Sequence, residues 1–293
     1  MTYGAPYLGS KSGIAKDIIN ALPDGKRLVD LFGGGFAISH CALDVGKYEN
    51  VLYNDVNPLI VNLVRDAIEG KYSYNVFTPR WISREEFHEK KNSDGYIKYC
   101  WSFGNAGGEY LYGRNIEDAK HELHDAVVYG VPYKGEVIEG DSIRERRLGS
   151  KKIVTKRLDL EQLQHLEQLE RLQQLEQLER LQHLERLQHL ERLQHLEITC
   201  ADYRDYEYQN GDVVYCDIPY QTTASTRCGG YGANFNWGEF FRWAESMPCP
   251  VYVSSYEGAC DCPAIWSKEK RVILSANDNR LKKKECLYKV GGD

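Results

Sequence analysis

The sequence lacks the features of a membrane or secreted protein. No apolar stretch approaches the roughly 20 residues that a membrane-spanning helix needs, and no signal peptide opens the chain. The nine cysteines are scattered, and Cys260-Asp261-Cys262 has no second pair with which to form a zinc site. We therefore expect a soluble, cytoplasmic protein with reduced thiols and no bound metal.

The chain as a whole also carries no excess of positive charge. The net charge is −6, so no basic field over the whole surface indicates a nucleic-acid partner, and any such site has to be a local patch. Two runs qualify. Residues 144–157 contain seven basic residues and one acid, and Lys282-Lys283-Lys284 stands near the C-terminus. An ordinary solvated surface is the alternative explanation for either run.

What is present is the composition of a globular protein, with 42% hydrophobic and 12% aromatic residues. The most informative stretch runs from Asp212 to Tyr220, where Val213-Val214-Tyr215-Cys216 predicts a buried strand that ends at the edge of a sheet. Asp217 can then accept a hydrogen bond from an amine, Pro219 fixes the turn and Tyr220 offers a flat stacking face. This stretch predicts a pocket for a planar amine, with a strand and an ordinary turn as the alternative.

The N-terminal part predicts a nucleotide-binding unit. Leu28–Phe32 has the pattern of a strand, Gly33-Gly34-Gly35 that of a tight turn, and Phe36–Val45 that of a helix. A second strand, Val51–Tyr53, ends at Asn54-Asp55, where an acid can hold ribose hydroxyls or cap the next helix. Position 38 is Ile, so the turn departs from the Gly-x-Gly-x-x-Gly pattern of dinucleotide sites.

The alternation of strands and helices stops at about Tyr72, where the chain becomes aromatic, glycine-rich and charged. This predicts a separate, loop-rich lobe that extends to Arg157, either a plain second domain or one that grips a polymer. The sheet then resumes with a strand at Leu196–Thr199, a helix at Trp237–Met247 and a strand at Val251–Ser255.

Leu160–Leu196 is a repeat with leucine at every third position, thirteen times. A period of three matches a 3₁₀-helix, which would place all the leucines on one stripe, but the residues between them are strong α-formers. A low-complexity tract without a selected shape is a third alternative. Because a stripe of leucines needs a partner, we expect a projecting arm that forms a homodimer.

Four motifs together give the chain a resemblance to a known family. They are Gly9-Ser10-Lys11, Phe32-Gly33-Gly34-Gly35, Asn54-Asp55 and Asp217-Ile218-Pro219-Tyr220. In this order they are similar to the motifs of DNA adenine-N6 methyltransferases, the group that includes the bacterial GATC methylase and its phage relatives. The glycines of the turn are consecutive here, and the family's Asp-Pro-Pro-Tyr has isoleucine as its second residue.

The resemblance implies the fold and the domains. They are a Rossmann-like α/β catalytic domain (residues 1–71 and 198–293) and an inserted target-recognition lobe (72–157). The leucine-repeat arm (158–197) lies outside the resemblance and is expected from the repeat itself. The resemblance also implies S-adenosylmethionine as cofactor, with these residues around it: Tyr7, Lys11, Asp30, Phe32, Gly33, Gly35, Asp55, Asp202 and Tyr203.

By the same resemblance, a flipped-out adenine is held by Asp217, the main-chain carbonyl of Ile218, Pro219 and Tyr220. Double-stranded DNA is the expected partner, and it is contacted by Arg114, Arg144, Arg146, Arg147, Lys151 and Lys152. Two alternatives stay open: a methyltransferase directed to RNA or to glutamine, and a nucleic-acid-binding homologue whose catalysis is weakened or lost through Ile218.

Overall fold

The computed structural model describes residues 2–156, 175–220, 235–273 and 280–292. The chain divides into two compact units. The first, the sheet unit, contains Met1–Ala5, Gly9–Arg65 and His189–Asp293, and the second, the helical unit, contains Pro6–Leu8 and Asp66–Gln188. Among the described residues, no helix combines the length and the apolar character that crossing a bilayer requires.

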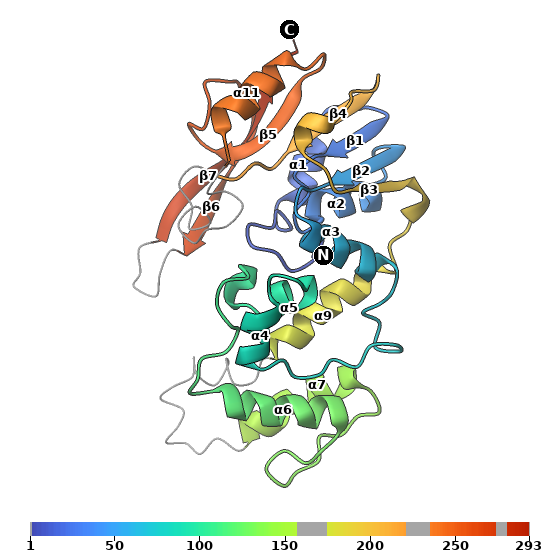
Figure 1. Ribbon diagram of the computed structural model, residues 1–293, viewed down its shortest axis with the longest axis vertical. Coiled ribbons are helices and arrows are strands. Elements are labelled where there is room, and N and C mark those ends of the chain that lie inside the picture. The colour runs from blue at the N-terminus through green and yellow to red at the C-terminus, as the bar shows by residue number, and fades with distance from the viewer. Residues whose placement is uncertain (1, 157–174, 221–234, 274–279, 293) are drawn as a thin grey trace. The chain divides into compact units, whose positions relative to one another are not determined.

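A seven-stranded sheet forms the centre of the sheet unit in the described part of the chain, with the order β3-β2-β1-β4-β5-β7-β6 (Figure 1). The first five strands pair in parallel, and β7 runs antiparallel to both of its neighbours. The strands are β1 (Arg27–Asp30), β2 (Asn50–Asn54), β3 (Leu196–Thr199), β4 (Asp212–Cys216), β5 (Val251–Tyr256), β6 (Ala264–Ile273) and β7 (Arg280–Val290).

The parallel strands are apolar because both faces of the sheet are covered. Val29, Leu52 and Val214 pack on one face against Phe240 of the helix α11. On the other face the ring of Tyr53 lies 5.2 Å from the ring of Phe36 at the start of α2. The helices of this unit are α1 (Ala15–Ala21), α2 (Ala37–Val45), α3 (Pro58–Ile68) and α11 (Trp237–Ser246), with short 3₁₀ turns η3 (Leu193–His195) and η4 (Tyr203–Asp205).

This topology fixes where a ligand binds. From β1 the chain order runs outward through β2 and β3, and on the other side it runs through β4 and β5, so the order reverses between β1 and β4. Open α/β sheets bind their ligands beyond the carboxyl ends of the strands at such a reversal. The predicted α/β fold is confirmed, as a mixed fold with a mostly parallel sheet, and Asp217 follows β4 at this edge.

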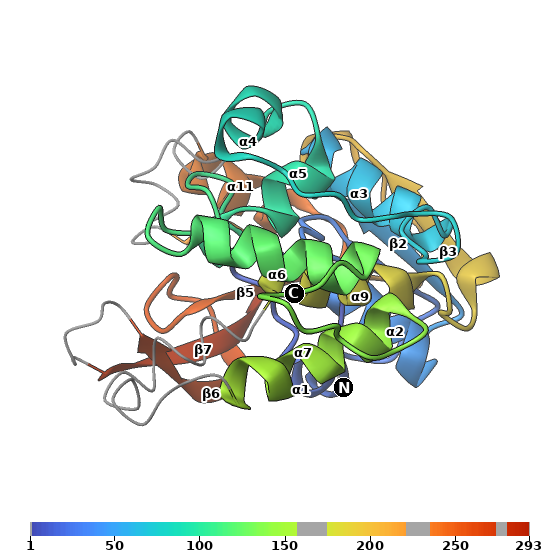
Figure 2. The ribbon, with the colours of Figure 1, turned by 90° about the horizontal axis from the view of Figure 1, so that it is seen from below.

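The helical unit is less irregular than we expected. It contains α4 (Arg84–Lys90), α5 (Gly95–Cys100), α6 (Glu117–Tyr129), α7 (Ile143–Lys156), α9 (Glu176–Leu187) and the 3₁₀ turn η1 (Phe103–Asn105). The lobe contains more helix than we expected, because Ser83 and Asp94 cap short helices that the aromatic composition conceals. Its core joins Leu123 and Val127 of α6 to Leu178 of α9, and Figure 2 shows these two helices close together.

The described half of the leucine repeat corrects the expected 3₁₀ stripe. Glu176–Leu187 is an α-helix, and only Leu193–His195 forms a 3₁₀ turn. In an α-helix a step of three residues turns by ~300°, so four successive leucines spread over about half of the circumference. That is a usable apolar face for a short helix, whereas all thirteen leucines would wind around the whole surface.

The projecting arm is also wrong for this half of the repeat. Leu178, Leu181, Leu184 and Leu187 are all fully buried within the helical unit. Because these leucines are covered by their own chain, they leave no exposed stripe for a second copy, and the reason for expecting a homodimer through them disappears. The other half of the repeat, to residue 174, lies outside the described residues.

Candidate active site

Four parts of the chain meet around one buried ammonium group. Lys11 is 4% exposed, and its Nζ lies 2.6 Å from both carboxylate oxygens of Asp217. The same nitrogen lies 3.7 Å from Oε1 of Glu285 on β7 and 4.9 Å from the centre of the Tyr220 ring. The Tyr220 hydroxyl donates a hydrogen bond to Glu285, and its ring lies 4.4 Å from that of Tyr256 on β5.

The charges of this cluster support one another. Burial by itself lowers the pKa of Lys11, but the negative charges of Asp217 and Glu285 outweigh it, and the pKa is raised overall. Burial, followed by the same two charges, raises the pKa of Tyr220 well above its ordinary value. Lys11 is therefore an ammonium ion and Tyr220 a neutral hydroxyl donor throughout the neutral pH range.

The glycine turn after β1 holds Asp55 in place. The backbone N–H of Gly34 donates to one oxygen of Asp55 at 2.9 Å, and the N–H of Asn57 donates to the other at 2.8 Å. Burial raises the pKa of Asp55, while these two hydrogen bonds act against the rise. A carboxylate has about four lone-pair sites, so Asp55 can still accept further hydrogen bonds.

Gly33 is required by close packing. A Cβ atom there would lie 2.3 Å from the ring of Tyr53, whose hydroxyl donates to the carbonyl of Gly34 at 2.8 Å. Only glycine lets the backbone run this close to the end of β2. The turn therefore packs directly against the carboxyl end of β2.

Asp30 ends β1 with an unsatisfied oxygen. Its Oδ2 accepts a hydrogen bond from Ser39 at 2.7 Å, but no described residue donates to Oδ1, although the side chain is 1% exposed. Burial raises the pKa of Asp30 to about 7, with Asp217 and Asp55 adding to the rise and Ser39 opposing it. A buried acceptor without a donor is costly, and a bound ligand can supply the donor.

Aromatic rings cover the opposite side of the edge. Phe32 lies 5.3 Å from Tyr203, which in turn lies 4.9 Å from Trp243 of α11. Beside them, a cavity of about 200 Å³ is lined by Asn54, Thr199 and Asp202 among others. Asp202 is held by Arg204 at 2.7 Å. The predicted pair Asp202-Tyr203 thus lies beside a cavity at the end of β3.

The residues after Asp217 are fixed by the core. The Ile218 side chain is 2% exposed and packs with Val214 and Phe240, so only its main chain belongs to the edge of the sheet. The carbonyl of Pro219 accepts a hydrogen bond from the indole N–H of Trp237 at 2.8 Å. Asn236 caps α11, because its side chain accepts a hydrogen bond from the backbone N–H of Glu239 at 3.0 Å.

Comparison with known proteins finds a family match over part of the chain. Residues 7–131 match the family described as D12 class N6 adenine-specific DNA methyltransferase. A DNA N-6-adenine-methyltransferase of Escherichia phage P1 is 22% identical over 225 residues, which are 75% of this chain and 24% of the phage protein. The chain thus spans about a quarter of the length of the relative it matches, and the resemblance found in the sequence is confirmed.

The matched family consists of methyltransferases, which use a methyl donor, and the acceptors at the edge of the sheet fit S-adenosylmethionine. That cofactor carries ribose hydroxyls, an ammonium group and a sulfonium cation. Asp55 and the unsatisfied Oδ1 of Asp30 are acceptors for such donors, and the glycine turn lets the backbone approach. Together with Asp217 and Glu285, these acids give the edge a surplus of negative charge that suits a cation.

Tyr7 is not among the residues that the structure brings together. It belongs to the helical unit, where its ring lies 5.2 Å from that of Tyr99. The predicted role of Tyr7 beside the cofactor therefore stays a prediction.

The predicted DNA-binding residues differ in their surroundings. Arg114 and Arg144 are exposed. Arg146 donates to the carbonyls of Val127, Val128 and Gly140, which secures the C-terminal end of α6. Arg147 donates to Glu179 and Gln182 of α9, at 3.0 Å and 2.9 Å. Lys151 and Lys152 lie in α7, and their side chains are outside the described part of the structure.

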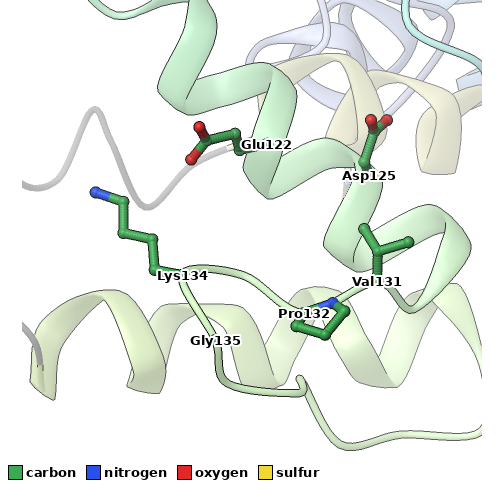
Figure 3. A pocket seen from close by; sticks show the side chains of 6 residues that line it. All are labelled: Glu122, Asp125, Val131, Pro132, Lys134 and Gly135. Carbon is green, nitrogen blue, oxygen red and sulfur yellow. The ribbon is translucent and has the colours of Figure 1, made fainter.

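A second cavity, of about 440 Å³, lies in the helical unit and contains none of the predicted site residues. Figure 3 shows Glu122 and Asp125 on α6 and Lys134 on the loop that follows it. Its two acids do not favour a phosphate group, so this cavity is a poor place for the DNA backbone.

Sequence reasoning missed Glu285, Tyr256 and Ser39. Glu285 is 2% exposed, although the three lysines before it in the sequence suggest a surface position. The available signal was the apolar run Cys286–Val290, because an acid directly before a buried apolar run needs a partner. The partner, Lys11, lies far away in the sequence and is found only through the pairing of β5 with β7.

Proposed function

We propose that this chain transfers a methyl group from S-adenosylmethionine to N6 of an adenine in DNA. The observation that carries the proposal is Asp217, an acid that follows β4 at the reversal of strand order and is paired with a buried ammonium group. The D12 family supports the adenine and the DNA. Bound at this edge, the cofactor would supply an electrophilic methyl group.

The chain's own residues would then prepare the amine. N6 of adenine is a poor nucleophile because its lone pair is delocalised into the ring. The Asp217 carboxylate and the carbonyl of Ile218 would accept hydrogen bonds from its two N–H groups, which draws electron density onto nitrogen and stabilises the positive charge that develops there. As the N–CH3 bond forms and the S–CH3 bond breaks, one of these protons would leave the nitrogen to solvent. Because Lys11 donates to both oxygens of Asp217, the same place already receives a nitrogen donor.

A base inside a duplex cannot reach this edge, so it must be flipped out. Tyr220 would stack on the extruded ring, which contributes about 1–3 kcal/mol. The peptide of Pro219, held by Trp237, would keep the turn in one geometry. Alignment of the amine with the methyl group supplies much of the remaining acceleration.

We further propose that the helical unit recognises the target DNA. Arg114 and Arg144 are the best candidates for the DNA contacts, because both side chains are exposed. Arg146 and Arg147 are bound to groups of their own unit and have less freedom to reach a phosphate. Changing Arg144 to Ala should lower the slope of log K against log salt by about one. Arg146→Ala is the matched control, in which the slope should stay as in the parent. An unchanged slope for Arg144→Ala would show that Arg144 does not contact a phosphate.

The function is tested by incubating the protein with S-adenosylmethionine and unmethylated DNA and mapping the product by single-molecule sequencing. We expect N6-methyladenine within one short sequence context. Methyl transfer to RNA or to a glutamine side chain instead would replace this proposal with one of the alternatives. Cofactor binding without any transfer would identify a nucleic-acid-binding homologue.

A further inference from the structure

Glu285 is a buried acid that the family motifs leave without a role. It is 2% exposed, and it lies on β7 opposite Tyr256 of β5. It accepts the hydrogen bond of the Tyr220 hydroxyl and lies 3.7 Å from the ammonium of Lys11. A fully buried carboxylate is retained only where it is paired and hydrogen-bonded, so its position needs a reason beyond packing.

The distances around Lys11 supply that reason. Its ammonium lies 2.6 Å from Asp217 and 3.7 Å from Glu285, so one carboxylate is in direct contact and the other is a short movement away. When a target amine donates to Asp217, it competes with Lys11 for the same two oxygens. A buried ammonium that loses its partner is strongly unfavourable unless a second acceptor is within reach.

The contact with Tyr220 adds a second effect. A tyrosine ring that is to stack on a base must be held at one angle, and the hydroxyl is its only anchor apart from packing. In this structure the Tyr220 hydroxyl donates to Glu285, and the centre of its ring lies 4.9 Å from the Lys11 ammonium and 4.4 Å from the centre of the Tyr256 ring. One carboxylate therefore touches both groups that must adjust when a base enters.

We propose, on the basis of the proposed methyl-transfer function, that Glu285 is a positioning residue of this site. It receives the Lys11 ammonium when the target amine takes its place on Asp217, and it fixes the ring of Tyr220 for stacking. Glu285 does not touch the methyl group or the reacting nitrogen in this account, so its effect passes through Lys11 and Tyr220.

The central variant is Glu285→Gln, which keeps the size and an acceptor for Tyr220 but removes the charge. We expect kcat to fall by roughly ten- to a hundred-fold while cofactor affinity stays within about two-fold. Glu257→Gln is the matched control, because Glu257 is an exposed acid that pairs with Lys284 at 2.8 Å on the same side of the sheet unit. Its kcat should equal the parent's. A parental kcat for Glu285→Gln, or an equal loss of cofactor affinity, would overturn the proposal.

A second variant and a titration test the role of Glu285 even where Glu285→Gln folds poorly or the parent shows no methyl transfer. Tyr220→Phe removes only the hydroxyl, and it should lower kcat with cofactor affinity unchanged. The titration of Lys11, followed by NMR of labelled lysine side chains and assigned with Lys11→Arg, needs no turnover. The groups that face Lys11 are Asp217, Glu285, Tyr220 and Tyr256.

We expect the pKa of Lys11 to be lower in Glu285→Gln than in the parent, because one of its two negative neighbours has lost its charge. An identical pKa of Lys11 in both proteins would show that Glu285 does not stabilise the Lys11 ammonium, and would overturn the proposal. A parent that fails to methylate any adenine would refute the proposed function, and the titration would still decide whether Glu285 holds Lys11.

Discussion

Two buried lysines, one in each unit, have nearly the same surroundings and opposite electrostatics. Lys11 lies 4.9 Å from the ring of Tyr220, and Lys120 lies 5.0 Å from the ring of Tyr112. The pKa of Lys120 is lowered, because burial outweighs the attraction of Glu176, which is 29% exposed and 3.3 Å away. The pKa of Lys11 is raised, because Asp217 and Glu285 outweigh its burial.

The difference separates a structural lysine from a functional one. A lysine over a tyrosine ring is a packing arrangement that either unit can use. Around Lys11, in contrast, the carboxylates outnumber the ammonium, and two more acids, Asp30 and Asp55, stand nearby on the same edge. The surplus of negative charge, rather than the buried lysine, is what suits this edge to the cation and the amine of the proposed reaction.

The largest expected effect comes from Asp217. Replacing Asp217 with Asn removes the charge that stabilises the developing positive nitrogen, so kcat should fall by at least about 10²–10³-fold. Cofactor affinity, measured by isothermal titration, should persist, because this side chain serves the base. Asp261→Asn is the control, since Asp261 is an exposed aspartate of the same unit. Near-parental turnover in Asp217→Asn would reject the assignment.

Asp55→Ala should have the reverse effect. It removes the proposed acceptor for the ribose hydroxyls, together with the hydrogen bonds from the backbone N–H groups of Gly34 and Asn57. Loss of hydrogen bonds to a charged group is expected to weaken cofactor binding by about 1.5–3 kcal/mol, roughly ten- to a hundred-fold. Titration calorimetry measures it directly, and an unchanged affinity would show that Asp55 only caps the turn.

Asp30 predicts a pH dependence of stability. Its pKa is raised to about 7, so the folded state disfavours the ionised form, and stability is lost as pH rises from about 4 to about 7. Asp30→Asn lacks this penalty. The variant should therefore gain stability relative to the parent over that range, on the order of 4 kcal/mol at most. Urea unfolding at pH 5 and pH 8 measures the gain, and a difference independent of pH would contradict the prediction.

The smallest effect is expected from Lys120. Lys120→Met removes a lysine whose charge is disfavoured by burial, and Glu176 is exposed enough to regain water. We expect kcat and cofactor affinity within about two-fold of the parent. A large loss of activity with an unchanged melting temperature would show that Lys120, like Lys11, acts in the reaction, and would contradict this distinction.

Local patterns predicted the sheet well. Apolar, β-branched runs located β1, β2, β3 and β4 to within two residues, and Asp55 and Asp217 followed from their places at strand ends. Burial on both faces leaves a strong signal in the sequence because nearly every position has to be apolar.

The rest depended on partners far away in the sequence. Glu285 meets Lys11 only through the antiparallel pairing of β5 and β7, which no local pattern encodes. The leucine repeat favoured a 3₁₀-helix only because its period of three was taken as the period of the structure. A short α-helix buries four such leucines on a broad face. Arg146 resembled a phosphate contact, yet it binds carbonyls at the end of α6.

The central claim, that the charged edge around Asp217 methylates adenine, is tested most directly by mass spectrometry of digested DNA after incubation with methyl-labelled S-adenosylmethionine. The account predicts labelled N6-methyldeoxyadenosine with the parent and with Lys120→Met, and none above background with Asp217→Asn. Label on another base, or equal labelling of adenine by the parent and Asp217→Asn, would contradict it.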